Sequence, residues 1–72
     1  MRTETPSIRW MARWQAAYVA AGGWAGPATL RAMAAKVATL YRAGATAKVV
    51  GIVMAEDFRL RSRLNTAEEL AS

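Results

Sequence analysis

The fold is decided by the stretch from Pro27 to Gly44, which reads PATLRAMAAKVATLYRAG. Its large apolar residues recur at spacings of three and four, the period of one face of an α-helix. A proline suits the first turn of a helix, and a glycine suits the position just after its end. This stretch therefore predicts a helix from about Pro27 to Ala43. Its apolar face consists of Leu30, Met33, Ala34, Val37, Leu40 and Tyr41.

A helix is also predicted before this stretch, from Ile8 to about Ala21. Ser7 can cap its first turn, and Gly22-Gly23 ends it. Both sides of this helix are apolar. One side carries Ile8, Met11, Ala12, Gln15, Tyr18 and Val19, and the other carries Trp10, Trp14, Ala17 and Ala21. Since so small a bundle cannot bury both sides, we expect one of them to meet a partner or a second copy of the chain.

The third predicted element covers residues 47–64. Thr46 can cap a helix over this range, with a possible break near Ala55. Either Asn65 or Thr66 would then cap a short helix at the end of the chain, with acidic residues in its first turn, where the helix dipole favours them.

A β-hairpin over residues 48–64 is the alternative for this element. Residues 49–53 are rich in β-branched side chains, and residues 58–64 alternate with period two. The turn at residues 55–57 would read Ala-Glu-Asp, which lacks the glycine or asparagine that a tight hairpin turn prefers. The helix is therefore favoured.

The predicted fold is mainly α, a small three-helix domain with a short C-terminal helix. The 72 residues suit one domain over 1–72, with residues 1–6 as a flexible arm. The hydrophobic fraction of 54% predicts a folded and not a disordered chain. Much of this fraction is alanine, which fills a core poorly, and so short a chain buries little surface alone. Both points favour a homodimer.

The residue types exclude most catalytic chemistry. The chain has no cysteine and no histidine, the usual zinc ligands and, for histidine, the usual general base near neutral pH. Glu56 and Asp57 are adjacent, so on a helix they point about 100° apart and cannot share a site. The glycine-rich residues 22–26 lack the lysine and the preceding strand of a phosphate-binding loop. We expect no enzyme, no metal and no cofactor.

The apolar segments also bear on location. Arg9 and Arg13 interrupt the apolar residues near the N-terminus, so no signal peptide is expected. Residues 16–26 and 49–55 are the longest apolar stretches, and both are shorter than the roughly 20 residues of a spanning helix. A cytoplasmic protein without integral membrane association is expected.

The charge is one-sided. The net charge is +5, and the chain from Thr5 to Ala55 contains no Asp or Glu. A field of one sign attracts a polyanion or an acidic protein surface. The basic residues from Arg9 onward are Arg9, Arg13, Arg31, Lys36, Arg42, Lys48, Arg59, Arg61 and Arg63.

Residues 40–51, LYRAGATAKVVG, resemble the front half of a helix-turn-helix of the resolvase and transposase type. The resemblance implies a helix with a small residue, Gly51, where two helices cross, and then a tight turn near Ala55-Glu56. Residues 57–64 would form the reading helix. It also implies DNA binding, with candidate contacts Arg42, Lys48, Arg59, Arg61 and Arg63. An acidic residue stands where that turn carries a glycine.

Arginine alternates with tryptophan near the N-terminus. Arg-Trp pairs can stack on single-stranded bases, sit at a membrane interface or anchor a protein interface, and indoles can also simply fill gaps between alanine-rich helices. The candidate partner-binding residues are Arg9, Trp10, Arg13, Trp14 and Trp24.

These patterns favour a small, basic DNA-binding or regulatory protein acting as a helical dimer. The alternative is a protein–protein interaction module, such as a phage- or plasmid-encoded inhibitor or adaptor. It would dock on an acidic or apolar protein surface through its Trp-rich and Val/Ile/Met faces. The two differ in salt dependence, which is steep for DNA binding.

Overall fold

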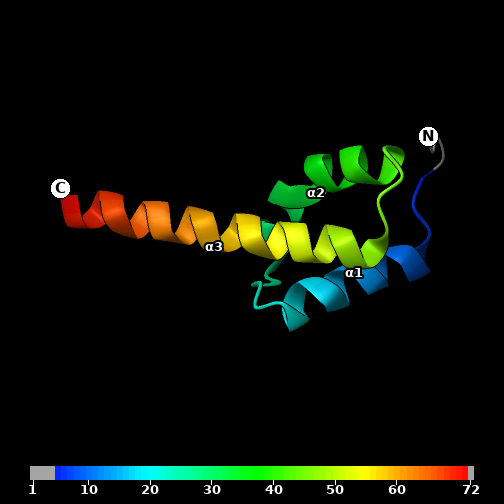
Figure 1. Ribbon diagram of the computed structural model, residues 1–72, viewed down its shortest axis with the longest axis horizontal. Helices are drawn as coiled ribbons and strands as arrows, with labels where there is room; N and C mark the ends of the chain where they lie inside the picture. Colours follow the sequence, from blue (N-terminus) through cyan, green and yellow to red (C-terminus); the bar gives the residue numbers. More distant parts are fainter. Residues whose placement is uncertain (1–4, 72) are drawn as a thin grey trace.

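The computed structural model describes residues 5–71 and contains three helices (Figure 1). They are α1 (Ile8–Ala20), α2 (Pro27–Arg42) and α3 (Ala47–Ala71), and residues 5–71 contain no strand. The prediction of a mainly α fold with three helices is confirmed, and the alternative hairpin over 48–64 is wrong. Most of the predicted arm, residues 1–4, lies outside the described residues.

The predicted caps begin the first and third helices. The Ser7 hydroxyl accepts a hydrogen bond from the Trp10 backbone N–H at 3.1 Å. The Thr46 hydroxyl accepts one from the Val49 N–H at 3.3 Å. Each cap satisfies an N–H that has no partner inside its own helix. Pro27 occupies the first turn of α2, as predicted from its position before the apolar repeat.

Glycines in the left-handed conformation end α1 and α2. Gly22 and Gly44 both have φ of +96°. Just beyond Gly22, the N–H of Gly23 donates back to the Tyr18 carbonyl at 2.9 Å, and beyond Gly44 the N–H of Ala45 donates to the Leu40 carbonyl at 3.0 Å. These bonds satisfy carbonyls at the helix ends and turn the chain sharply.

A single helix of 25 residues extends from Ala47 to Ala71. The break expected near Ala55 and the separate short helix after Asn65 are therefore wrong. Ala55 is fully buried against the other helices, so packing supports the helix where a turn was expected. The Thr66 hydroxyl donates to the Ser62 carbonyl at 2.9 Å and thus does not cap a new helix. After Gly51, α3 contains no glycine or proline that would favour a break.

α1 and α2 pack against the first half of α3, residues 47–58, on two sides (Figure 1). The buried side chains of this half recur every three or four residues. The β-branched residues that suggested a strand are divided by this period, because Val50 is buried while Val49 and Ile52 are exposed. The core consists of Trp14, Tyr18, Met33, Val37, Tyr41, Ala47, Val50, Met54 and Ala55.

α1 crosses α3 at Gly51. A Cβ atom at this position would lie 2.5 Å from the Ala17 Cβ and 2.6 Å from the Trp14 carbonyl oxygen. Only glycine allows the two backbones to approach this closely. Gly51 is thus a small residue at a helix crossing, but the crossing helix is α1 and not a reading helix further along the chain.

One face of α1 points inward and combines residues from both predicted stripes. Trp14 and Tyr18 are buried and Trp10 is half-buried, with its ring centroid 4.7 Å from that of Tyr41 in α2. Ile8 is exposed. The division into two stripes is therefore wrong, because Trp14 and Tyr18 are four residues apart and share one face. Because Trp14 is buried, no face of α1 presents both Trp10 and Trp14 to a partner.

Candidate nucleic-acid interface

The last 13 residues of α3, from Arg59 to Ala71, project beyond the bundle and are called the projecting segment (Figure 1). Every described side chain in it is exposed. The whole of α3 is about 37 Å long at 1.5 Å per residue, and the molecule measures 44 × 21 × 19 Å. The segment can thus be approached from almost any direction.

Three predicted contact residues lie at the start of this segment. At about 100° per residue, Arg59 and Arg63 are one turn apart, while Arg61 points about 200° away from Arg59. A strand would have aligned all three on one face. Because the segment is helical, they form two groups on opposite sides of α3.

Arg59 is attached to the end of α1. Its guanidinium donates a hydrogen bond to the Ala21 carbonyl, at the C-cap of that helix. A cation stabilises this helix end because unpaired carbonyls give it partial negative charge. Arg59 therefore has a structural contact, although much of its side chain remains exposed.

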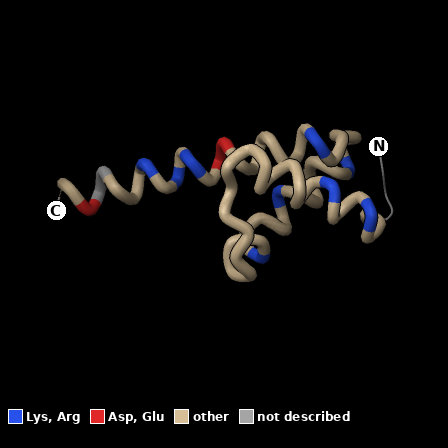
Figure 2. The backbone as a smooth tube through the Cα atoms, turned by 90° about the horizontal axis from the view of Figure 1, so that it is seen from below, with Lys and Arg blue, Asp and Glu red and all other residues tan. Residues whose placement is uncertain are grey.

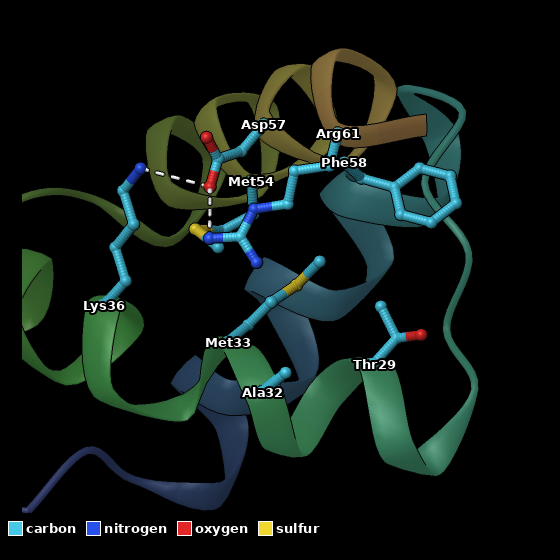
Figure 3. Close-up of a pocket in the computed structure, with 8 residues that line it drawn as sticks. All are labelled: Thr29, Ala32, Met33, Lys36, Met54, Asp57, Phe58 and Arg61. Carbon is cyan, nitrogen blue, oxygen red and sulfur yellow. Dashed lines mark ion pairs between the residues drawn. The ribbon is translucent and has the colours of Figure 1, made fainter. Parts of the chain in front are cut away.

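Arg61 and Lys36, which lies on α2, both contact the carboxylate of Asp57. The Asp57 Oδ2 atom lies 3.2 Å from Lys36 Nζ and 3.9 Å from Arg61 Nη2, as Figure 3 shows. One carboxylate thus faces two cations, and the cluster keeps a net positive charge. Both cations are largely exposed, so each pair contributes at most about 1 kcal/mol.

A small cavity lies beside this cluster, between α2 and α3 (Figure 3). Its volume is about 70 Å³, and Met33, Met54 and Phe58 form much of its wall. The cavity is too small for a substrate or a cofactor.

Arg63 makes no ion pair or hydrogen bond with the described residues. Arg42 and Lys48 lie near the opposite end of α3, on either side of the turn that precedes it. Lys48 and Arg63 are separated by about 22 Å along the helix axis. The five predicted contacts therefore form two groups and not one patch.

The wider charge distribution is basic on all three helices (Figure 2). The nine Lys and Arg residues within 5–71 are all exposed. Among them only Lys36 and Arg61 form ion pairs with described carboxylates, and both use Asp57.

The predicted partner-binding residues are separated by the fold. Trp14 is 1% exposed, so its assignment to a partner surface is wrong, since this indole fills the core between α1 and α3. Trp10 is half-buried against Tyr41. Trp24 is 65% exposed, and Arg9 and Arg13 are exposed on α1.

The range of the helix-turn-helix resemblance, residues 40–64, folds as the end of α2, a turn and most of α3. Residues 55–57 are helical, so the second turn near Ala55-Glu56 is not formed. The proposed reading helix, residues 57–64, is the continuation of the helix before it.

Exposed leucines on α3 were not among the predicted site residues. Leu60, Leu64 and Leu70 are 55%, 56% and 84% exposed. Their signal in the sequence is the spacing of four between the first two, on a segment that no other helix covers.

Within residues 5–71, no helix is long and apolar enough to cross a membrane. The described side chains also form no group of three Asp or Glu residues that could hold a metal ion. No protein-family model matches the chain, and comparisons with curated proteins and with solved structures give no match.

Proposed function

We propose that this protein binds duplex DNA, with the projecting segment of α3 as its main contact. The observation that supports the proposal is the exposure of Arg59, Arg61 and Arg63 on a helix that leaves the bundle. An α-helix with its side chains is about 10–12 Å across, which matches the roughly 12 Å width of the major groove. The bundle does not obstruct such an approach (Figure 1).

Two features indicate electrostatic rather than base-specific recognition. The arginines point to opposite sides of the helix, so both walls of a groove offer phosphates to them. Leu60 and Leu64 lie between them and offer no hydrogen bonds to base edges. We therefore infer binding of moderate, micromolar affinity at low salt with little sequence preference.

The test compares two triple variants by titration with a fluorescent duplex in 50–200 mM salt (about the range over which such binding changes most). Arg59→Ala/Arg61→Ala/Arg63→Ala should weaken binding and flatten the salt dependence by up to about three units, one per phosphate contact. The matched control, Arg9→Ala/Arg13→Ala/Arg31→Ala, removes equal charge from α1 and α2 and should have the smaller effect. No binding by the wild type at the lowest salt, or equal losses in the two variants, would contradict the proposal.

Docking on another protein is the second candidate function, and the exposed leucines of the same segment favour it. Binding of this kind would change little with salt, because an apolar interface releases few counterions. The salt series therefore separates the two candidates.

A further inference from the structure

The outer face of α3, opposite α1 and α2, carries a stripe of mainly apolar residues with two charged residues among them. At about 100° per residue, its members lie within an arc of about 120°. Val49, Ile52, Leu60, Leu64 and Leu70 are each at least 41% exposed. We call this stripe the outer face; it consists of Val49, Ile52, Val53, Glu56, Leu60, Arg63, Leu64 and Leu70.

The outer face has the spacing of a coiled-coil seam. Val49, Val53, Leu60 and Leu70 fall on the alternating steps of four and three by which two helices pack along their length, and the steps at 56 and 63 carry charged residues. The first half of this seam lies over the bundle, and the second half lies on the projecting segment. A helical segment without tertiary contacts gains stability when an apolar face packs against a partner, so pairing along this face would stabilise the projecting segment.

Only two charged residues of α3, Glu56 and Arg63, fall within this arc, and they have opposite signs. Neither makes an ion pair with another described residue. Two copies of α3 packed parallel would place Glu56 beside Glu56 and Arg63 beside Arg63. Packed antiparallel, they would place each Glu56 at the level of the other copy's Arg63, and the two charges would pair twice across a two-fold axis.

We propose that the outer face of α3 binds a second copy of this chain, antiparallel, with the two-fold axis near residues 59 and 60. In this register the projecting segment of each copy covers the outer face above the bundle of the other. Leu70 of one copy lies level with Val49 of its partner, and the two Leu60 side chains meet at the axis. The outer face is thus covered by α3 of the second copy. In the antiparallel arrangement the charges of the two helices are complementary. This inference does not depend on DNA binding.

The oligomeric state is the first test, by sedimentation equilibrium of the full chain from micromolar to millimolar concentration. We expect a monomer–dimer equilibrium. Leu60→Lys should raise the dissociation constant at least about tenfold, since burying a leucine contributes more than one tenfold step. Ser62→Lys, on the opposite side of the helix, is the matched control and should change it little. Both residues are exposed, so neither change disturbs the core. A monomer throughout the range would overturn the proposal.

Charge reversal tests the pairing. Glu56→Arg and Arg63→Glu should each weaken the dimer, and the double variant Glu56→Arg/Arg63→Glu should restore it, because the swapped charges pair again. A parallel dimer would show no such restoration, and that result would contradict the antiparallel arrangement.

Cross-linking tests whether the two copies of α3 pair antiparallel. The chain contains no cysteine, so only an introduced cysteine can form a disulfide. An equimolar mixture of the Val49→Cys and Leu70→Cys proteins should oxidise to the mixed disulfide. Val49→Cys alone should not cross-link, because its two copies would lie about 31 Å apart along the axis, far beyond disulfide reach. Efficient cross-linking of Val49→Cys alone would show a parallel pair.

Discussion

Gly51 sets the distance between α1 and α3, so a single methyl group there tests the packing. Gly51→Ala would place its Cβ within 2.7 Å of three atoms of α1, two of them backbone atoms that cannot move alone. The higher helix propensity of alanine would stabilise the fold by about 1 kcal/mol, which is less than the free energy lost when the helices move apart. We expect a net loss of about 2 kcal/mol or more in the free energy of unfolding, measured by urea denaturation.

Gly44 provides a contrasting case, because a substitution there would lower the free energy of unfolding through backbone strain alone. A Cβ at Gly44 would meet no atom within 4 Å, but φ is +96°. Gly44→Ala should cost about 1–2 kcal/mol, the penalty of this conformation for an L residue. A loss as large as that of Gly51→Ala would show that space is not what distinguishes the two sites.

Tyr18 links stability to alkaline pH. Burial raises the pKa of its hydroxyl above the usual 10.0, and the protonated hydroxyl donates a hydrogen bond to the Trp24 carbonyl, 2.6 Å away. The unfolded chain therefore loses this proton first, so the stability that Tyr18 contributes is present below pH 10.0 and falls as pH rises through the folded pKa.

Tyr18→Phe tests this linkage. The variant should lose about 1 kcal/mol at neutral pH, the net value of one hydrogen bond. Above pH 10.0 the wild type should lose stability more steeply than the variant, and the difference between them should shrink. Urea midpoints of both proteins between neutral and alkaline pH give the answer, and parallel curves would refute the assignment.

Among the elements, α2 was the most predictable from sequence. Its apolar face, Pro27 and Gly44 agree with one another, and the helix forms between them. α1 was predicted in extent but not in orientation, since apolar residues on both sides left its inward face undecided. Only the position of α3 shows that the face with Trp14 and Tyr18 is the one buried.

α3 was harder to predict because two of its signals point to a strand. The β-branched residues 49–53 and the alternation over 58–64 arise from other causes. Over 49–53 both faces of the helix are apolar, because one packs on the bundle and the other is the outer face. Over 58–64 arginines and leucines alternate on a segment whose side chains after Phe58 are all exposed. The role of Arg59, Arg61 and Arg63 as candidate contacts stays a prediction, whereas the contacts of Arg59 with α1 and of Arg61 with Asp57 could not be predicted because they depend on tertiary structure.

The two halves of α3 should differ in hydrogen exchange. In dilute solution, amides of residues 60–71 should exchange far faster than those of residues 50–58, because no helix packs on the projecting segment. At high concentration residues 60–71 should become protected as the outer face pairs. Uniform protection of α3 in a dilute monomer would mean that the segment is stable alone.

For the whole molecule, the excess of positive charge should make salt stabilising. The net charge is +5, and exposed arginines and lysines cover all three helices. Their mutual repulsion is screened as the Debye length falls from about 30 Å at 0.01 M to about 8 Å at 0.15 M salt. We expect the thermal midpoint to rise by a few degrees over this range.

A charge-reducing variant provides the control for this effect. Arg42→Glu should diminish the salt dependence, since Arg42 is exposed and forms no ion pair with a described residue that would be lost with it. A midpoint that falls with salt in the wild type would mean that attractive pairs such as Lys36–Asp57 outweigh the repulsion.

Because α3 is one uninterrupted helix, a rotation at its crossing with α1 moves its far end. Ala71 lies 20 residues beyond Gly51, an arm of about 30 Å. A rotation of about 10° at the crossing would therefore displace the tip by about 5 Å, as much as one helical turn. Small changes in packing around Gly51 are thus amplified along α3, and the direction in which the far end points is set inside the bundle.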